Sequence, residues 1–214
     1  MYITLDLMAA FIRCRYKAFL RCTGDSGVAT EYELLQRELA DEYQEKAIAL
    51  LTARFTPNEI IFNPPSLEDA SQGRYRLILN AACNPERGSI TFPAIEHTTS
   101  RTSTTKHEYA LIASSPTNKL SKDEKLTAAM LGSALSSWHG LTVASVKMIH
   151  GPQFSTTTLM LLGTKGRTRL GNEVAVMLHD LEVLAASPAP PPMYLNDHCG
   201  ICEWPASQNL IHVL

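Results

Sequence analysis

The spacing of the apolar residues changes along the chain, and this change limits the folds that it can adopt. From about residue 31 to residue 55 the apolar residues recur at helical spacing, which predicts one long amphipathic helix that Pro57 ends. From Arg74 onward apolar and polar residues alternate, as they do in strands with one buried face. A long helix followed by a run of strands predicts an α/β fold. The apolar stripe of the helix consists of Leu34, Leu35, Leu39, Tyr43, Ala47, Leu50 and Leu51.

Turn and cap residues predict the other elements. Thr4 caps a first helix, and Ser121 with Glu124 forms a capping box for a helix that ends near Gly140. Pro93 lies inside the second strand and predicts an edge position or a bulge there. The strands are expected as a meander over 74–83, 89–99 and 107–114, then near 141–150 and 154–162, before a helix from the cap Asn172 to about 186.

The composition indicates one globular domain, residues 1–214. The chain of 214 residues is 45% hydrophobic with a net charge of −2, which argues against global disorder. No apolar run reaches the roughly 18 residues that a membrane helix needs, and the N-terminus does not look like a signal peptide. We therefore expect a cytoplasmic protein without a membrane partner. Thiols stay reduced there, so the five cysteines favour metal binding or core packing over disulfides.

Two of these cysteines, Cys199 and Cys202, are spaced as a metal-binding pair. The spacing brings two thiolates together across a tight turn at Gly200, and the adjacent His198 is a possible further ligand. A proline-rich spacer over 187–193 separates this cysteine-containing tail, 194–214, from the rest of the chain. The alternative interpretation is a pair of buried thiols.

Further ligands must come from Cys14, Cys22 or Cys83. Cys14 and Cys22 are eight residues apart, which is about 12 Å on a continuous helix. They cannot both bind one ion unless the helix breaks between them. Cys83 lies beside a turn in an apolar strand and fits a core thiol better.

The two ends of the chain resemble a known group of nucleases. The N-terminal Cys-Arg-Tyr-Lys-Ala-Phe-Leu from Cys14 and the C-terminal His-Cys-x-x-Cys-Glu-Trp from His198 are similar to RecB-like families of the PD-(D/E)XK nuclease superfamily. These families include the iron–sulfur exonucleases associated with CRISPR adaptation. The segment from Lys119 to Gly151 is also similar. The resemblance implies a core of a helix, a three-strand meander, a helix and a strand, with N-terminal helices and a cysteine-bearing tail.

The same resemblance implies an iron–sulfur cluster that ties the chain ends together. In the family, one N-terminal cysteine joins three near the C-terminus, and the matching positions here are Cys14, Cys199 and Cys202. Gln208 stands where the third C-terminal cysteine is expected. The site can therefore use another ligand, His198 or Cys22, or hold zinc, or be empty.

The resemblance further implies hydrolysis of DNA with Mg²⁺ or Mn²⁺, ions that prefer oxygen ligands. The family places an Asp on the second strand, an acid on the third, and a Lys two residues after that acid. Here the candidates are Glu96 and Glu108, but Pro93 stands near the Asp position and Ala110 replaces the Lys. The two glutamates can share a metal if they lie on one face. Otherwise they are exposed strand carboxylates.

Two basic segments are candidate nucleic-acid contacts. The first contains Arg13, Arg15, Lys17 and Arg21, and the second contains Lys165, Arg167 and Arg169. Each can instead be a solvated surface.

Two functions are consistent with these features. The first is a RecB-like nuclease-family protein that binds single-stranded DNA or DNA ends, with a degenerate catalytic site and other nucleic-acid-processing proteins as partners. The second is a non-catalytic interaction module stabilised by zinc or a cluster.

Overall fold

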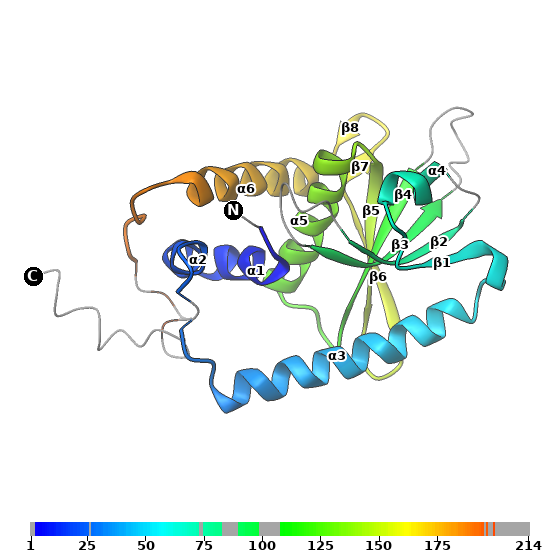
Figure 1. The fold of residues 1–214 in the computed structure, drawn as a ribbon, viewed down its shortest axis with the longest axis horizontal. Coiled ribbons are helices and arrows are strands. Elements are labelled where there is room, and N and C mark those ends of the chain that lie inside the picture. The colour runs from blue at the N-terminus through cyan, green and yellow to red at the C-terminus, as the bar shows by residue number, and fades with distance from the viewer. Residues whose placement is uncertain are drawn as a thin grey trace, which may run out of the picture.

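The computed structural model describes residues 3–25, 27–72, 75–82, 90–98, 108–194, 196 and 199. The predicted ligands His198 and Cys202 lie outside these residues, and so does Cys83, which was predicted to be a core thiol. The described chain is a mixed α/β structure with one six-stranded sheet and helices on both of its faces (Figure 1). The α/β prediction is therefore confirmed.

The sheet has the order β1-β2-β3-β4-β5-β6. The meander β2–β3–β4 is antiparallel, and α5 then crosses over so that β5 lies parallel to β4. The strands are β1 (Ile60–Phe62), β2 (Leu77–Ala82), β3 (Thr91–Thr98), β4 (Glu108–Ser115), β5 (Thr142–His150) and β6 (Ser155–Met160). The helices are α1 (Leu5–Arg13), α2 (Arg15–Cys22), α3 (Glu31–Thr52), α4 (Leu67–Gln72), α5 (Lys122–His139) and α6 (Arg169–Ala186).

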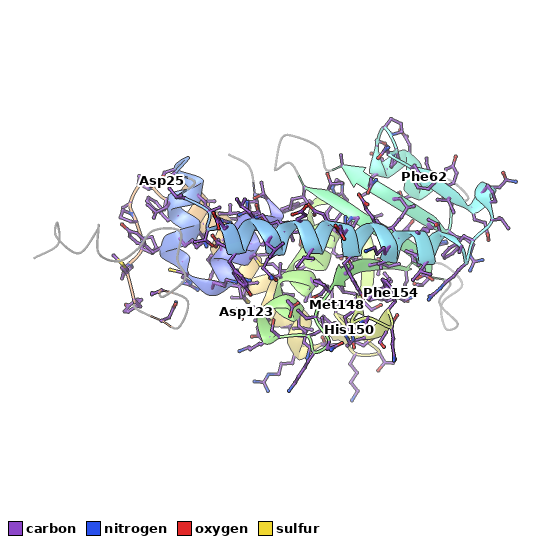
Figure 2. All side chains as sticks on the ribbon, turned by 90° about the horizontal axis from the view of Figure 1, so that it is seen from below. Asp25, Phe62, Asp123, Met148, His150 and Phe154 are labelled. Atoms are coloured by element: carbon purple, nitrogen blue, oxygen red, sulfur yellow. The ribbon has the colours of Figure 1, made fainter. Side chains whose placement is uncertain are left out.

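The two faces of the sheet are covered unequally. One face packs against α1, α5 and α6 in a large core that contains Phe11, Phe92, Leu131 and Leu181. The other face is covered by α3, which Figure 2 shows running across the sheet. Along the chain, burial of α3 begins at Tyr43, and its side chains face strand residues such as Leu79.

The apolar stripe predicted for α3 is buried only in part. Tyr43, Ala47 and Leu51 are buried, whereas Leu34, Leu35, Leu39 and Leu50 are exposed. For Leu34, Leu35 and Leu39 the reason is geometric: a helix of 22 residues is about 33 Å long, and its first half extends past the sheet. Leu50 lies in the half that packs on the sheet, and its side chain is 48% exposed.

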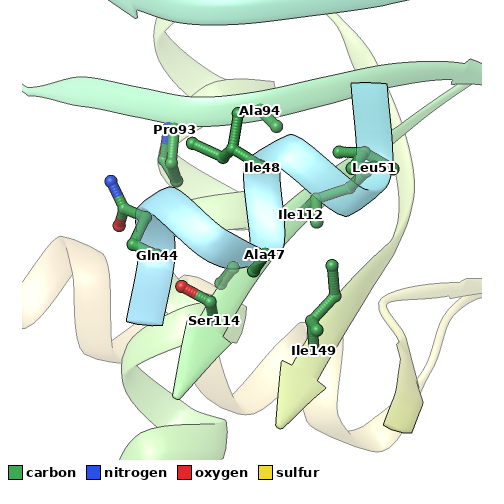
Figure 3. Close-up of a pocket in the computed structure, with 10 residues that line it drawn as sticks. Gln44, Ala47, Ile48, Leu51, Pro93, Ala94, Ile112, Ser114 and Ile149 are labelled. Carbon is green, nitrogen blue, oxygen red and sulfur yellow. The ribbon is translucent and has the colours of Figure 1, made fainter. Parts of the chain in front are cut away.

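The pocket beneath α3 is too small for a ligand. Aliphatic side chains, including Ile48, Ile112 and Ile149, line most of it (Figure 3). It holds about 10 Å³, which is room for one water molecule.

Pro93 does not mark an edge strand, because β3 lies between β2 and β4. The β3–β4 ladder begins at Ala94, and the β2–β3 ladder skips from the Leu79 pair to the Ala81 pair. The skipped residue, Asn80, has a φ of 52°, which interrupts β2 opposite the proline. The missing N–H of Pro93 therefore falls where neither ladder pairs it, and the alternative of a local irregularity fits the observed register.

The last helix begins earlier than predicted. Its cap is Thr168, whose hydroxyl accepts a hydrogen bond from Gly171 N–H, and not Asn172. Gly171 lies so close to the carbonyl of Leu161 that no Cβ fits there. This contact places the first turn of α6 against the sheet. Short elements were also missed: β1, α4, and a hairpin of β7 (Leu162–Gly163) and β8 (Gly166–Arg167).

The capping box of α5 is present and extends into a larger network. Glu124 accepts hydrogen bonds from the Ser121 backbone N–H and from the hydroxyls of Ser115 and Thr117. Burial alone would raise the pKa of Glu124, but these hydrogen bonds outweigh it and lower the pKa. The network ties the end of β4 to the start of α5.

We expect Glu124→Ala to lower the free energy of unfolding by about 1–3 kcal/mol, because the buried Ser115 hydroxyl loses its acceptor. The folded-state pKa of Glu124 lies below its ordinary value of 4.5. The contribution of Glu124 to the free energy of unfolding is therefore complete above pH 4.5, and it is lost as the pH falls through the folded-state pKa. Urea unfolding at pH 7 and pH 3 measures the difference from wild type, with Lys122→Ala as the control. A difference that stays constant down to pH 3 would contradict this account.

Candidate functional site

One face of the sheet is partly covered by α3. Beyond the helix, this face carries polar side chains. Strand side chains alternate between faces, and Ala94, Ile112 and Ile149 lie against α3. Residues two positions away along the same strands therefore share that face. We call five of them the polar strip: Glu96 and Thr98 on β3, Glu108 on β4, and Ser145 and Lys147 on β5.

The central contact of the polar strip is an ion pair between strands that are not neighbours. Lys147 Nζ lies 2.5 Å from Glu96 Oε2, and the two side chains are 30% and 21% exposed. On β4, which separates them, Ala110 is directly opposite Glu96. The methyl side chain of Ala110 leaves room for the long lysine side chain to cross β4.

Glu96 and Glu108 lie on one face of the sheet, which is the condition under which the two glutamates could share a metal. Glu108 is directly opposite Thr98, whose hydroxyl donates to the Glu108 carbonyl at 2.9 Å. Glu108 is thus the diagonal neighbour of Glu96, at a spacing of about 7–8 Å between backbones.

These residues do not fit a magnesium centre. Lys147 already occupies a carboxylate oxygen of Glu96, so a divalent ion would have to displace it. Among the residues that the structure describes, no cluster of three or more His, Cys, Asp or Glu side chains can hold a metal ion. The charged groups of the polar strip are one lysine and two carboxylates, which give it a net charge of −1.

Sequence reasoning missed Lys147. The available signal was a single lysine inside the otherwise apolar and small-residue run of β5, Thr-Val-Ala-Ser-Val-Lys-Met-Ile-His. Its partner depends on the register of three strands, including the shift between Tyr109 and Ala110. That register is not readable from local sequence.

The second basic segment lies near the polar strip. Met160 pairs with Ser145, and Leu161 N–H donates to the Ala144 carbonyl at 2.9 Å, so the chain enters the β7–β8 hairpin beside this end of β5. Figure 1 shows the hairpin at the end of the sheet away from α3. Lys165 and Arg167 are exposed on it, while Arg169 begins α6.

The cations of the first basic segment contact the protein itself. Arg15 pairs with Asp180 at 2.7 Å and lies over the Phe11 ring, and Arg21 donates to the Asp6 carbonyl. Lys17 is buried, whereas Arg13 is exposed.

The two basic segments lie near different positions along α6. Arg15 pairs with Asp180, which lies eleven residues along α6 from Arg169, or about 16 Å.

The structure brings Cys199 toward Cys14 from the opposite end of the chain. Cys14 is an extended residue between α1 and α2, and its Sγ accepts a hydrogen bond from Lys17 N–H at 3.5 Å. Asn196 donates from Nδ2 to the Arg13 carbonyl at 2.9 Å, and its backbone N–H donates to Cys199 Sγ at 3.3 Å. Asn196 thus links Cys199 to Arg13, the residue that precedes Cys14 at the α1–α2 junction.

Cys22 does not join them. Helix α2 is continuous from Arg15 to Cys22, so Cys14 and Cys22 lie at its opposite ends. Cys22 packs against the core, and burial raises the pKa of its thiol. A thiol that resists deprotonation is a poor metal ligand. Cys14 and Cys199, as soft thiolate donors, fit zinc or an iron–sulfur cluster.

Comparisons with known proteins leave the family open. No protein-family model matches this chain, and no curated protein matches it. A solved structure described as the crystal structure of SSO0001 aligns with 88% of this chain and 78% of its own, at 11% identity and a TM-score of 0.36. A likeness at that level carries no argument. None of the described helices is long and apolar enough to cross a membrane.

We expect Lys147→Met to increase the affinity for Mn²⁺ by about tenfold or more, since a tenfold change needs only about 1.4 kcal/mol. The substitution removes the cation that competes for Glu96 and keeps most of the length of the side chain. Electron paramagnetic resonance of free Mn²⁺ measures the dissociation constant, with Lys165→Met as the control. Equal affinities of the wild type and Lys147→Met would show that Lys147 does not guard the carboxylates.

Proposed function

We propose that this protein binds single-stranded DNA or DNA ends on a PD-(D/E)XK nuclease-like core that has lost strong cleavage activity. The observation that carries the proposal is Lys147 Nζ, 2.5 Å from Glu96, at an end of the sheet that α3 does not cover, beside the basic hairpin.

The order of elements supports this choice of core. A long helix, an antiparallel three-strand meander, a crossover helix and a strand parallel to the third occur in this order as α3, β2–β4, α5 and β5, with the short elements β1 and α4 between α3 and β2. This is the order that the resemblance of the sequence to RecB-like nucleases implies.

The charges of the polar strip and of the β7–β8 hairpin together support binding better than cleavage. A phosphate group is repelled by Glu96 and Glu108 but attracted by Lys147, Lys165 and Arg167. Lys147 neutralises the carboxylate nearest to it, and the hairpin then adds cations along the path of a strand. The pair of Lys147 with Glu96 also withholds from a metal the carboxylate that hydrolysis would need.

Labelled single-stranded DNA incubated with Mg²⁺ or Mn²⁺ tests the loss of cleavage. We expect no robust degradation by the wild type, and no further decrease in the Glu108→Ala variant. Robust degradation that disappears on Glu108→Ala would overturn the claim of a degenerate site.

Fluorescence anisotropy with the same oligonucleotide at several salt concentrations tests binding. The double variant Lys165→Ala/Arg167→Ala is expected to bind more weakly and to reduce the salt slope by about 2, one for each lost phosphate contact. The control is Arg54→Ala, an exposed arginine after α3. If binding is undetectable at low salt, or unchanged by both Arg15→Ala and Arg167→Ala, the protein is not a DNA-binding protein of this kind.

A second candidate function is a non-catalytic interaction module in which a cysteine-bound metal ties the chain ends together. The hydrogen bond from Asn196 to the Arg13 carbonyl favours it, because that contact holds Cys199 near Cys14. Cys14 and Cys199 would be ligands, joined by Cys202 and by His198, and the bound group would be an iron–sulfur cluster or zinc. Such a module would dock other nucleic-acid-processing proteins.

Anaerobic purification followed by metal analysis and a visible absorption spectrum tests the cysteine site. Iron with sulfide and a brown colour indicate a cluster, and stoichiometric zinc indicates a structural zinc site. Cys14→Ser is expected to lower metal content several-fold, while the control Cys22→Ser keeps it. Metal-free wild-type protein, or equal loss in both variants, would argue against a site at the α1–α2 junction.

A further inference from the structure

The first half of α3 stands apart from the body of the protein as an intact helix. Residues 31–42 are exposed almost throughout, whereas burial begins at Tyr43. A capping box of Thr30 and Glu33 starts the helix, so its unpacked end is still held in helical form. We call residues 31–42 the acidic arm. Figure 1 shows it extending beyond the sheet.

The acidic arm carries large apolar side chains along one side. Tyr32, Leu35 and Leu39 follow the spacing i, i+3, i+7 and are 66%, 51% and 43% exposed. Leu34 adds a further exposed leucine next to them. Scattered apolar residues on a surface need no explanation, but a continuous row on one projecting helix indicates a contact surface.

The charges around this row are nearly all negative. Five carboxylates stand in the acidic arm against a single cation, Arg37, and they are Glu31, Glu33, Glu38, Asp41 and Glu42. A nucleic acid or an anionic membrane surface would be repelled by them. Two copies of the arm packed on each other would bring like charges together, which disfavours self-association.

We propose that the acidic arm docks a cationic amphipathic helix of a partner protein. The apolar face of such a helix would cover Tyr32, Leu35 and Leu39, and its lysines or arginines would lie opposite the flanking carboxylates. Because the arm is already helical, binding does not carry the conformational-entropy cost of ordering it. The proposed surface is separate from the polar strip and does not depend on DNA binding.

The probe is a designed 21-residue peptide with leucine at heptad a and d positions and lysine at the others. Isothermal titration with the full chain should give 1:1 binding that weakens as salt is added. The variant Leu35→Gln/Leu39→Gln should bind at least tenfold more weakly, because glutamine has nearly the helix propensity of leucine but offers no apolar surface. Leu50→Gln is the matched control, since Leu50 is exposed on α3 outside the arm.

Two further measurements keep the result interpretable. A scrambled peptide of the same composition should not bind. Equal binding of both peptides would show that charge alone accounts for the affinity, and it would overturn the proposal. Sedimentation of the free protein should give a monomer. A dimer that Leu35→Gln/Leu39→Gln abolishes would assign the row to a second copy instead. A fall in Tm of more than a few degrees in that variant, but not in Leu50→Gln, would mean that the chain itself covers the row.

Discussion

The packing of the second half of α3 on the sheet is the interaction on which the other surfaces depend. Tyr43, Ala47 and Leu51 bury one part of that sheet face, and the Tyr43 hydroxyl donates to the Gly151 carbonyl at 2.7 Å, which fixes the helix beside the β5–β6 turn. Because α3 covers only part of the face, the polar strip lies outside the area that the helix buries. Because only the second half of α3 packs on the sheet, its first half projects as the acidic arm. The placement of one helix thus creates two separate surfaces.

On the part of the face that α3 does not cover, the lysine of the polar strip lies on β5 and not on β4. The resemblance to RecB-like nucleases leads one to expect a lysine at the position of Ala110. Here the small side chain of Ala110 lets Lys147, from the next strand, reach across to Glu96. A cation is therefore present on the face but is bound to a carboxylate. Under the proposed function, this arrangement favours recognition of phosphate over assembly of a metal-dependent hydrolase.

Local signals predicted much of the fold, and non-local contacts supplied what they missed. The Ser121–Glu124 capping box and the left-handed Gly140 delimit α5 as expected, because cap chemistry is encoded within a few residues. The cap at Asn172 was wrong because Thr168 and Gly171 are fixed by contacts to Met160 and Leu161. The prediction for Pro93 left an edge position and a bulge as alternatives, because the interruption at Asn80 lies on another strand and cannot be seen in the segment around Pro93. The Lys147–Glu96 pair and the approach of Asn196 to Arg13 depend on tertiary structure, so no pattern within the sequence could indicate them.

The most direct measurement of the role of Lys147 is nuclear magnetic resonance of the lysine side-chain ammonium groups while single-stranded DNA is added. If Lys147 receives the phosphate backbone, its 15Nζ resonance will shift and saturate with DNA. Lys46 serves as the internal reference, because it pairs with Glu42 on α3, 3.4 Å away. Its resonance is expected to stay in place. A Lys147 resonance that does not move at saturating DNA, while the DNA is demonstrably bound, would contradict the assignment of the polar strip as the binding surface.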